Sequence, residues 1–417
     1  MTRAPLCSRN PEEVLDSRTI EDPHAFYARV REEHPLSRVA ETGVHLVATW
    51  EGIIEVLNRT DDFSANLTGV LVRDEQNQPI AFDLPATDGT QVIATADEPH
   101  HAIHRKLIRP RLSDARIAKL EDTIRGWTRE SLAGWLENGG GDFAPLAEIV
   151  PARAVGSLLG LPDGDVEQHR LWAMMGGEIL AGDVNQDSMM GLAMETGKMA
   201  EYLRDHLERA MNDPDRPDPG EESLLHTLAD GVQAGQITAS EATGIAIVMF
   251  GAGGESTSSL IGSAVRLLAQ DPDLAQQLRE EPELIARFVE EALRMEPPFK
   301  FHYRAVRREC ELAGFTLVPG DRLMLLWAAA NRDPAIFPSP DSLQLDRKHP
   351  KHHMSFGRGT HFCIGATLAR LETRVVIEEI LKSTKRFQLD SEAPFEPARS
   401  IFVRRLHRLP LVCESSI

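Results

Sequence analysis

The chain has 417 residues, of which 42% are hydrophobic and 26% are charged, and this is enough for a large buried core. Its net charge of −19 argues against nonspecific binding to nucleic acid. No signal-peptide core opens the sequence, and no run approaches the ~18 apolar residues of a spanning helix. We therefore expect a cytoplasmic protein that binds neither nucleic acid nor membrane.

The cysteines show no spacing that is typical of disulfides or of zinc sites. They are scattered along the chain as Cys7, Cys310, Cys363 and Cys413, and no Cys-x-x-Cys pair occurs. In a reducing compartment this pattern argues against a disulfide framework.

The N-terminal part predicts a short extension, then mixed elements. We expect residues 1–21 to be loosely ordered. Residues 22–64 predict a helix in HAFYARVREEHP, a strand in GVHLVATW and a second helix in EGIIEVLNR. Residues 65–96 are rich in Gly, Asp, Thr and Pro and indicate a long loop, which in a compact protein is usually functional.

The middle of the chain, residues 97 to about 295, has a helical pattern. Thr238 to Gln270 predicts an unusually long helix that begins with a capping box of Thr238 and Glu241. Its centre is apolar on all sides, so the helix should be buried. The next predicted helix ends before Pro297 and has one apolar face, made by Ile285, Phe288, Val289, Ala292 and Leu293.

The C-terminal part predicts strands over 310–330 around a VPGD turn, a proline-rich meander, a loop around Cys363, a helix to about Thr384 and short final strands. No linker is evident. We therefore predict one domain over residues 1–417, mainly α with small β-sheets (an α+β fold).

Cys363 lies in SFGRGTHFCIGATLAR, directly before a helix-like run. Free amides and the positive end of the helix dipole favour a thiolate there. Gly357 and Gly359 permit a tight turn, so that a flat ligand can approach the backbone closely. A thiolate in such a loop is a good axial ligand for iron and favours O–O cleavage. Taken alone, the cysteine is also consistent with a buried structural residue.

The segment FGRGTHFCIG resembles the haem-binding loop of the cytochrome P-450 family, which reads Phe-Gly-x-Gly-x-His-x-Cys-x-Gly. Four further stretches match in the family's order, from about residue 22 to 412, and the chain is most similar to soluble bacterial members. The resemblance implies the P-450 fold, with heme b (iron protoporphyrin IX) between the long central helix and the cysteine loop. It makes Cys363 the thiolate ligand of the iron, and Phe356 and Gly365 haem contacts.

Four cationic or polar side chains match haem-propionate donors of the family. His101 and Arg105 are spaced i, i+4 in ADEPHHAIHRKL and lie on one helix face. Arg304 in FHYRAVRR and His361 in the cysteine loop match other donors. Each residue alone is ordinarily a solvated charge, but buried propionates need charge-assisted partners.

Glu291 and Arg294 in FVEEALRM match the family's Glu-x-x-Arg pair, which implies a role in folding and haem retention rather than in chemistry. The family often completes this network with an arginine from the meander. Ser342 stands at that position here, so the sequence leaves open which group completes the network, and Arg347 is a candidate.

The stretch FGAGGESTSS lies midway along the long helix and resembles the family's oxygen-activation motif, Ala/Gly-Gly-x-Asp/Glu-Thr. By this match Ala252 and Gly253 line a groove for dioxygen, Glu255 is the acid, and Ser256 replaces the usual Thr. A hydroxyl orients a proton-carrying water and a carboxylate relays protons from solvent. Thr257 is able to share the role of Ser256. The alternative is a glycine-weakened core helix with a capping acid.

Several regions match the family's substrate-facing segments: the loop 65–96, residues 298–302 and Ile401–Phe402. Lys300 and His302 are unusual there, and either meet a polar or acidic substrate group or point to solvent. The Met-rich stretch 172–199 covers the distal side by the same analogy, although methionines also serve as core packing.

The resemblance implies a monooxygenase that inserts one oxygen atom from dioxygen into a mostly apolar small molecule. No flavin or iron–sulfur domain fits in the remaining length, so electrons come from a separate ferredoxin and ferredoxin reductase, and NAD(P)H acts only indirectly. We expect a monomer. The alternatives are a peroxide-driven oxygenase and a non-catalytic haem-binding sensor.

A docking face for an acidic ferredoxin is predicted on the thiolate side of the haem. Its cations, which are otherwise expected to be solvated, are Lys106, Arg109, Arg111, Lys348, Lys351, Arg358 and Arg370.

Overall fold

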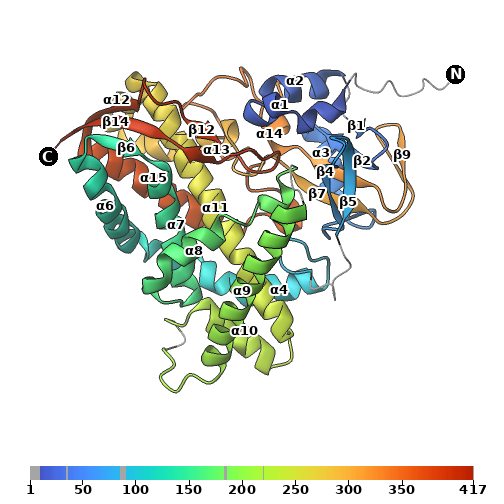
Figure 1. The fold of residues 1–417 in the computed structure, drawn as a ribbon, viewed down its shortest axis with the longest axis horizontal. Coiled ribbons are helices and arrows are strands. Elements are labelled where there is room, and N and C mark those ends of the chain that lie inside the picture. The colour runs from blue at the N-terminus through green and yellow to red at the C-terminus, as the bar shows by residue number, and fades with distance from the viewer. Residues whose placement is uncertain (1–9, 34–35, 85–90, 183–185, 219, 417) are drawn as a thin grey trace.

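The fold is mainly helical with small β-sheets, which confirms the predicted class. The computed structural model describes residues 10–33, 36–84, 91–182, 186–218 and 220–416. Figure 1 shows most strands on one side of the molecule, helices on the other, and the long helix α11 running through the middle.

The helices before the central one are α1 (Ser17–Glu21), α2 (His24–Glu33), α3 (Trp50–Asn58), α4 (His100–Ile108), α5 (Asp114–Ala118), α6 (Glu121–Glu137), α7 (Ala144–Leu159), α8 (Val166–Ala173), α9 (Gln186–Met211) and α10 (Leu224–Gln233). The central helix and those after it are α11 (Ala239–Gln270), α12 (Pro272–Glu280), α13 (Ile285–Met295), α14 (Trp327–Ala330) and α15 (Ala366–Ser383).

The largest sheet has the order β1-β2-β10-β7-β3, and only the β2–β10 pair is parallel. Its strands are β1 (Leu36–Val39), β2 (Val44–Val47), β3 (Phe63–Ser64), β7 (His302–Val306) and β10 (Arg322–Leu325). Strands β2 and β10 are buried along their whole length, because apolar clusters cover both faces of the sheet.

The remaining strands form a three-stranded sheet and three two-stranded ones. In the three-stranded sheet, in the order β11-β14-β6, the strand that follows α6 pairs with a strand of the C-terminal segment after α15. The strands of these four smaller sheets are β4 (Gly69–Arg73), β5 (Pro79–Asp83), β6 (Gly140–Asp142), β8 (Cys310–Leu312), β9 (Phe315–Leu317), β11 (Thr384–Leu389), β12 (Glu396–Pro397), β13 (Leu406–Arg408) and β14 (Pro410–Ser415).

Helix α11 begins as predicted. The Thr238 side chain accepts from the Glu241 N–H, and the Glu241 carboxylate accepts from the Thr238 N–H, so two amides at the helix start are satisfied. By length and composition α11 is apolar enough to cross a membrane, but so is a core helix. It packs against α7, α8, α9 and α15, which accounts for its apolar surface as core packing.

The structure differs from the predicted elements in several places. Residues 69–83 in the expected long loop form the β4–β5 hairpin, and α12 follows α11 after Asp271 alone. The prediction of a loosely ordered segment 1–21 is wrong for its second half, because residues 11–21 form two helical segments that bury Val14, Leu15 and Ile20. Residues 1–9 lie outside the described residues.

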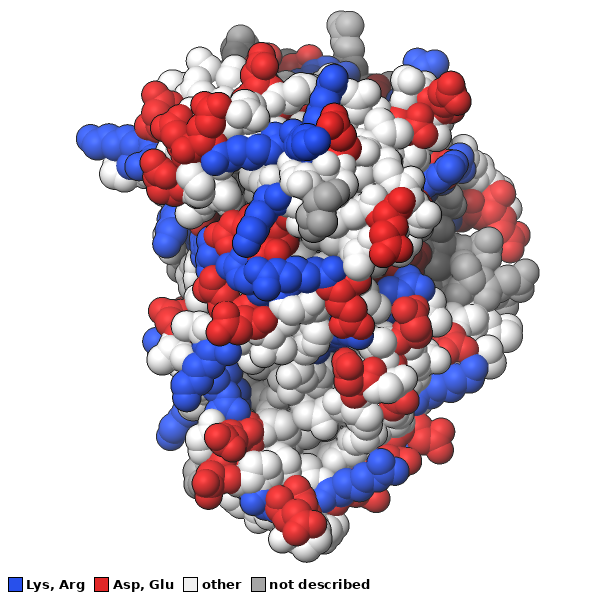
Figure 2. Space-filling view, turned by 90° about the vertical axis from the view of Figure 1, so that its left-hand side faces the viewer, with Lys and Arg blue, Asp and Glu red and all other residues white. Residues whose placement is uncertain are grey.

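Arginine–glutamate pairs tie α6 to α15. Arg125 and Arg129 on α6 contact Glu379 on α15, and Arg374 on α15 contacts Glu121 on α6. On the face that Figure 2 shows, positive and negative side chains lie side by side. This face therefore carries no continuous patch of one sign.

Candidate functional site

The cysteine loop is a tight turn that ends at the start of α15. Gly357 and Gly359 have φ of 65° and 73°, in the left-handed region that glycine adopts without strain. The Gly357 N–H donates to the Met354 carbonyl, and the Cys363 N–H donates to the Phe356 carbonyl, both at 2.8 Å. These bonds fix the loop backbone that leads to the sulfur.

Burial raises the pKa of the Cys363 thiol, although the Gly365 and Ala366 amides and Arg105 act in the opposite direction. We expected the helix start to favour the thiolate, and burial outweighs that effect here. A metal cation at the sulfur reverses this balance, because a coordinating thiol is deprotonated. The three cysteines among the described residues are free, as expected.

One cavity lies between α11 and the cysteine loop, and it brings together every predicted site residue except Glu255. On the loop side it is lined by Phe356, Gly357, His361, Cys363, Ile364 and Gly365. On the side of α11 it is lined by Val248, Met249, Ala252, Gly253, Ser256, Thr257 and Leu260. The walls also include His101, Arg105 and Arg304.

The side chains of Ser256 and Thr257 on α11 line this cavity. Ser256 Oγ donates to the Ala252 carbonyl one turn earlier at 2.5 Å. Such a bond commonly bends a helix. Thr257 beside it is buried. The Oγ lone pairs of Ser256 remain available as acceptors, so this hydroxyl is able to orient a water molecule.

Glu255 occupies a different cavity. Its carboxylate lies 3.4 Å from Arg405 Nε and borders a cavity of about 780 Å³ lined also by Glu178, Ser400 and His407. Burial raises the pKa of Glu255 to about 8, although Arg405 lowers it. At neutral pH the side chain therefore carries a proton.

Two of the predicted propionate donors in the first cavity have a buried ring nitrogen without a partner. His101 and His361 stack with ring centroids 4.0 Å apart, and His101 Nε2 and His361 Nδ1 have no hydrogen-bond partner among the described residues. Burial lowers the pKa of Arg304 to about 10 and that of His361 to about 3. A ligand with hydrogen-bonding groups would satisfy these nitrogens, and the two propionates of a haem, beside the Arg304 guanidinium, fit this requirement.

Arg358 has a different place from the one predicted. Its guanidinium lies 4.6 Å from the centre of the Trp50 ring, and Nε is buried without a partner. The side chain borders the first cavity rather than standing free on the surface.

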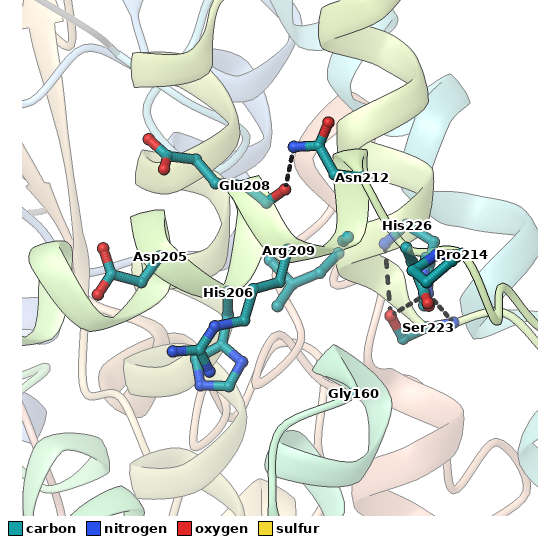
Figure 3. Close-up of a pocket in the computed structure, with 12 residues that line it drawn as sticks. Gly160, Asp205, His206, Glu208, Arg209, Asn212, Pro214, Ser223 and His226 are labelled. Carbon is teal, nitrogen blue, oxygen red and sulfur yellow. Dashed lines mark hydrogen bonds and ion pairs between the residues drawn. The ribbon is translucent and has the colours of Figure 1, made fainter.

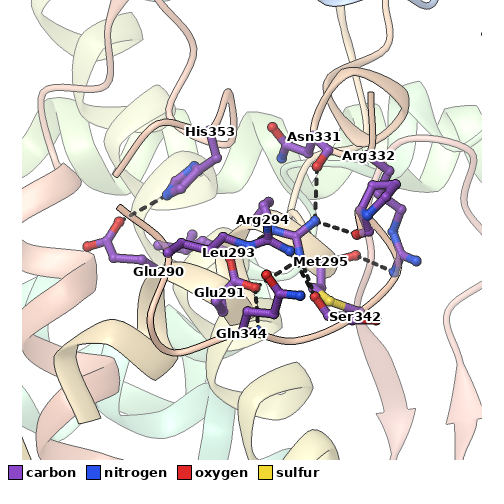
Figure 4. A network of polar contacts seen from close by, with 12 residues as sticks. Glu290, Glu291, Leu293, Arg294, Met295, Asn331, Arg332, Ser342, Gln344 and His353 are labelled. Carbon is purple, nitrogen blue, oxygen red and sulfur yellow. Dashed lines mark hydrogen bonds and ion pairs between the residues drawn. The ribbon is translucent and has the colours of Figure 1, made fainter. Parts of the chain in front are cut away.

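The Glu291–Arg294 pair is fully buried, with contacts of 2.8 and 2.9 Å (Figure 4). Arg294 also donates to the carbonyls of Asn331 and Ser342. Arg347 Nε lies 2.9 Å from Glu291 Oε1, which confirms Arg347 as the residue that completes the network. The pair thus joins α13 to the meander behind the cysteine loop.

Some of the predicted substrate-facing residues line the cavity and others do not. His302 and Phe299 line the cavity, and Phe402 stacks on Phe299 at 4.5 Å from behind. Lys300 points away, because its Nζ donates to the Ser400 carbonyl at 2.6 Å in the core. The expectation that Lys300 meets substrate or solvent is therefore wrong.

The Met-rich stretch supplies core packing and surface. Met174 and Met199 are buried in a cluster with α8, α9 and α10, and Met190 and Met194 are exposed. Among its described side chains, none is found in the cavity wall. Sequence reasoning missed Trp327, which lines the cavity and donates from Nε1 to His302 Nδ1 at 2.7 Å. Its apolar surroundings in LLWAAA give no signal for this role.

One group in the described part of the chain has the composition of a metal site: His100, His104 and Glu241. His104 Nδ1 accepts from the Ile93 N–H at 3.2 Å, so its proton is on Nε2, which faces Glu241. A metal needs the lone pair of that nitrogen. The arrangement thus fits a polar contact between α4 and α11, 3.4 Å from His104 Nε2 to Glu241, better than metal binding.

Comparisons with known proteins identify the family of the chain. The cytochrome P450 family model matches residues 195–402. Cytochrome P450 144 of Mycobacterium tuberculosis is 37% identical over 98% of this chain and 92% of its own, and the vitamin D(3) 25-hydroxylase of Pseudonocardia autotrophica is 31% identical over 94% of each. The crystal structure of CYP109E1 from Bacillus megaterium with testosterone has a TM-score of 0.83 at 26% identity, over 95% of this chain and 99% of that one.

The fold and these relatives define a haem-thiolate oxygenase. The chain belongs to the cytochrome P450 family, as its relatives over nearly the whole length show. It is accordingly a monooxygenase that uses haem with an axial cysteine thiolate.

Proposed function

We propose that Cys363 is the iron ligand of this enzyme and that it oxidises a small, mostly apolar molecule with electrons from a separate ferredoxin and ferredoxin reductase. The observation that carries the proposal is the convergence of the Cys363 sulfur, unpartnered propionate donors and the hydroxyl face of α11 on one cavity. The thiolate and dioxygen chemistry is supplied by the haem when it is bound.

The residues around the cavity bind the haem and orient a water molecule. His101, Arg105, Arg304 and His361 hold the propionates, and Phe356 and Gly365 leave room for the flat group. On α11, Ala252 and Gly253 keep the groove wide. Ser256, assisted by Thr257, orients a water next to the reacting oxygen.

Glu255 supplies that water with protons from the solvent side. Its carboxyl group is adjacent in sequence to Ser256 but borders the second cavity. A buried acid with a pKa of about 8 is protonated at neutral pH and is therefore able to donate.

The substrate is proposed to be apolar because the distal walls are apolar. Ile93, Ala94, Val248, Met249 and Phe299 form them. His302 is held neutral by burial, with its pKa lowered to about 3, and shares a strand face with Arg304. None of the described side chains in this part of the wall offers a carboxylate to a cationic substrate.

Electrons are proposed to enter from an acidic ferredoxin. Of the predicted docking cations, Arg111 is engaged by Glu222 and Arg370 by Glu290. Lys106, Arg109, Lys348 and Lys351 are exposed, and no carboxylate partner is recorded for them among the described residues. A negative surface would therefore meet these four cations. We also propose that the enzyme is a cytoplasmic, single-domain monomer over residues 1–417.

The test is reconstitution of the haem-loaded protein with a surrogate ferredoxin, its reductase and NADH, after a ligand screen that follows the haem spectrum. Oxygenated product formed in proportion to NADH consumption supports the proposal. Turnover with hydrogen peroxide that exceeds turnover with electron donors would identify a peroxide-driven oxygenase. Ligand binding without turnover under both conditions would identify a sensor.

A matched pair of variants tests the docking face. Lys106→Glu and Lys351→Glu should raise the KM for ferredoxin and leave turnover with peroxide unchanged. Lys385→Glu, on β11, is the control. An unchanged KM in the first two variants would contradict docking on this face.

A further inference from the structure

A second group of polar side chains lies outside the first cavity, where α9 ends and α10 begins. Ser223 Oγ is 2.9 Å from His226 Nδ1, and His226 Nε2 is 3.0 Å from Asp213 Oδ2. A hydroxyl, an imidazole and a carboxylate in this order are the nucleophile, the base and the orienting group of acyl transfer.

The hydrogen bonds favour one tautomer of the neutral imidazole. Since Asp213 accepts from Nε2–H, the Nδ1 lone pair is directed at Ser223 and is able to take the hydroxyl proton. Asp213 is itself held, because its Oδ1 accepts from the Asp215 N–H at 3.0 Å. The base is thus oriented from a segment outside the helix that carries it.

Part of this arrangement is a capping box. Ser223 caps α10, its Oγ accepts from the His226 N–H, and His226 Nδ1 accepts from the Ser223 N–H, both at 3.3 Å. In the usual box the third residue is Glu or Gln, whose side chain accepts from the N–H of the capping residue. Here it is a histidine, an imidazole base whose other nitrogen contacts a carboxylate, and capping alone requires neither feature.

The group opens onto a cavity. A hollow of about 670 Å³ is lined by Ser223 and His226 on one side and by His206 and Arg209 of α9 on the other, with Gly160 beside them (Figure 3). This volume is sufficient for a small ligand. A side chain at Gly160 would overlap Ser223, because a Cβ there would lie 2.6 Å from Ser223 Oγ.

We propose that Ser223, His226 and Asp213 form a second catalytic site that hydrolyses small carboxylic esters without the haem. Ser223 Oγ attacks the ester carbonyl carbon as its proton passes to His226 Nδ1. The C–O bond to the alcohol then breaks, and His226 returns the proton to the leaving alkoxide. Water attacks the acyl-serine with the same proton transfers, which releases the acid and restores Ser223.

The start of α10 provides donors for the oxyanion of each step. The first N–H groups of a helix have no partner within it, and those of Leu224 and Leu225 directly follow the nucleophile. Such donors, together with the helix dipole, stabilise negative charge.

The experiment uses the full-length, haem-loaded protein with 4-nitrophenyl acetate as substrate and a fluorophosphonate as a serine-directed label. We expect the label on Ser223, and hydrolysis that falls at least tenfold in Ser223→Asp, His226→Ala and Asp213→Asn. Ser223→Asp retains a capping side chain, so that a folded variant without the nucleophile is available. Ser113→Ala, a serine at the start of α5, is the control and should match the parent.

Two results would overturn the proposal: absence of label at Ser223 in the folded parent, or equal hydrolysis by the parent and Ser223→Asp. Either identifies the group as a capping box alone. The carbon monoxide spectrum of the haem is recorded for each variant and should not change. Failure here is therefore distinct from failure of the oxygenase proposal.

Discussion

The carboxylate of Glu255 lies 3.4 Å from the Arg405 guanidinium, in a cavity that Ser256, its neighbour on α11, does not line. Successive residues of one helix thus face two separate cavities. This relationship gives Glu255 access to the solvent side while the Ser256 hydroxyl faces the haem side, and several tests follow from it.

Product formation should depend on pH through Glu255. Burial raises its pKa to about 8, so the acid is protonated below that pH and loses its proton above it. The rate of coupled turnover should therefore fall as the pH rises through about 8. Glu255→Gln should be at least tenfold slower and independent of pH in this range, whereas Glu178→Gln, more exposed beside Arg405, should retain the profile. An unchanged inflection in Glu255→Gln would show that another group titrates.

Replacement of Ser256 by Ala should uncouple oxygen consumption from product formation. The variant loses the hydroxyl that donates to the Ala252 carbonyl and faces the cavity. Ser256→Thr retains the hydroxyl and should remain coupled. The ratio of product to NADH consumed measures the effect. If Ser256→Ala stays coupled and Thr257→Val does not, the water-orienting role belongs to Thr257.

Haem retention should depend on Arg304. Its buried guanidinium faces the cavity, and a hydrogen bond between charged groups contributes about 1.5–3 kcal/mol. Transfer of haem from Arg304→Met to apomyoglobin should therefore be at least about tenfold faster than from the parent. Arg38→Met, which loses only a surface pair with Glu41, should behave as the parent. Equal transfer rates in all three proteins would remove Arg304 from the propionate donors.

Arg347→Met should destabilise the fold. It removes a nearly buried cation 2.9 Å from Glu291, and the loss of one partner of a buried pair costs about 3 kcal/mol. Urea unfolding measures the change, with Arg386→Met on β11 as an exposed control. A change no larger than that of the control would mean that Arg294 alone suffices for Glu291.

The sequence was most informative where a local pattern determines the structure. The capping box of Thr238 and Glu241 begins α11 as predicted, because both partners lie within one turn. The glycines of the cysteine loop and the run after Gly365 likewise act over a few residues. For the same reason, the spacing of residues in the sequence could show which of them share one face of a helix.

Long-range packing accounts for what the sequence did not predict. Lys300 alternates with Phe299 along an extended segment, and only the distant Ser400 determines that its side chain turns into the core. The β4–β5 hairpin was obscured by its Gly, Asp and Pro content, since its pairing depends on a cross-strand register. Asp271 is both the last capping residue of α11 and the first capping residue of α12. Because a single residue separates the two helices, no pattern in the sequence indicated that a second helix begins there.

The most direct test of the account is the spectrum of the reduced protein with carbon monoxide. The parent, Cys310→Ala and Cys413→Ala should all show the long-wavelength Soret band that is the hallmark of the family, and Cys363→Ala should lose it. Persistence of the band in Cys363→Ala, or its absence from the haem-loaded parent, would contradict ligation of the iron by this sulfur.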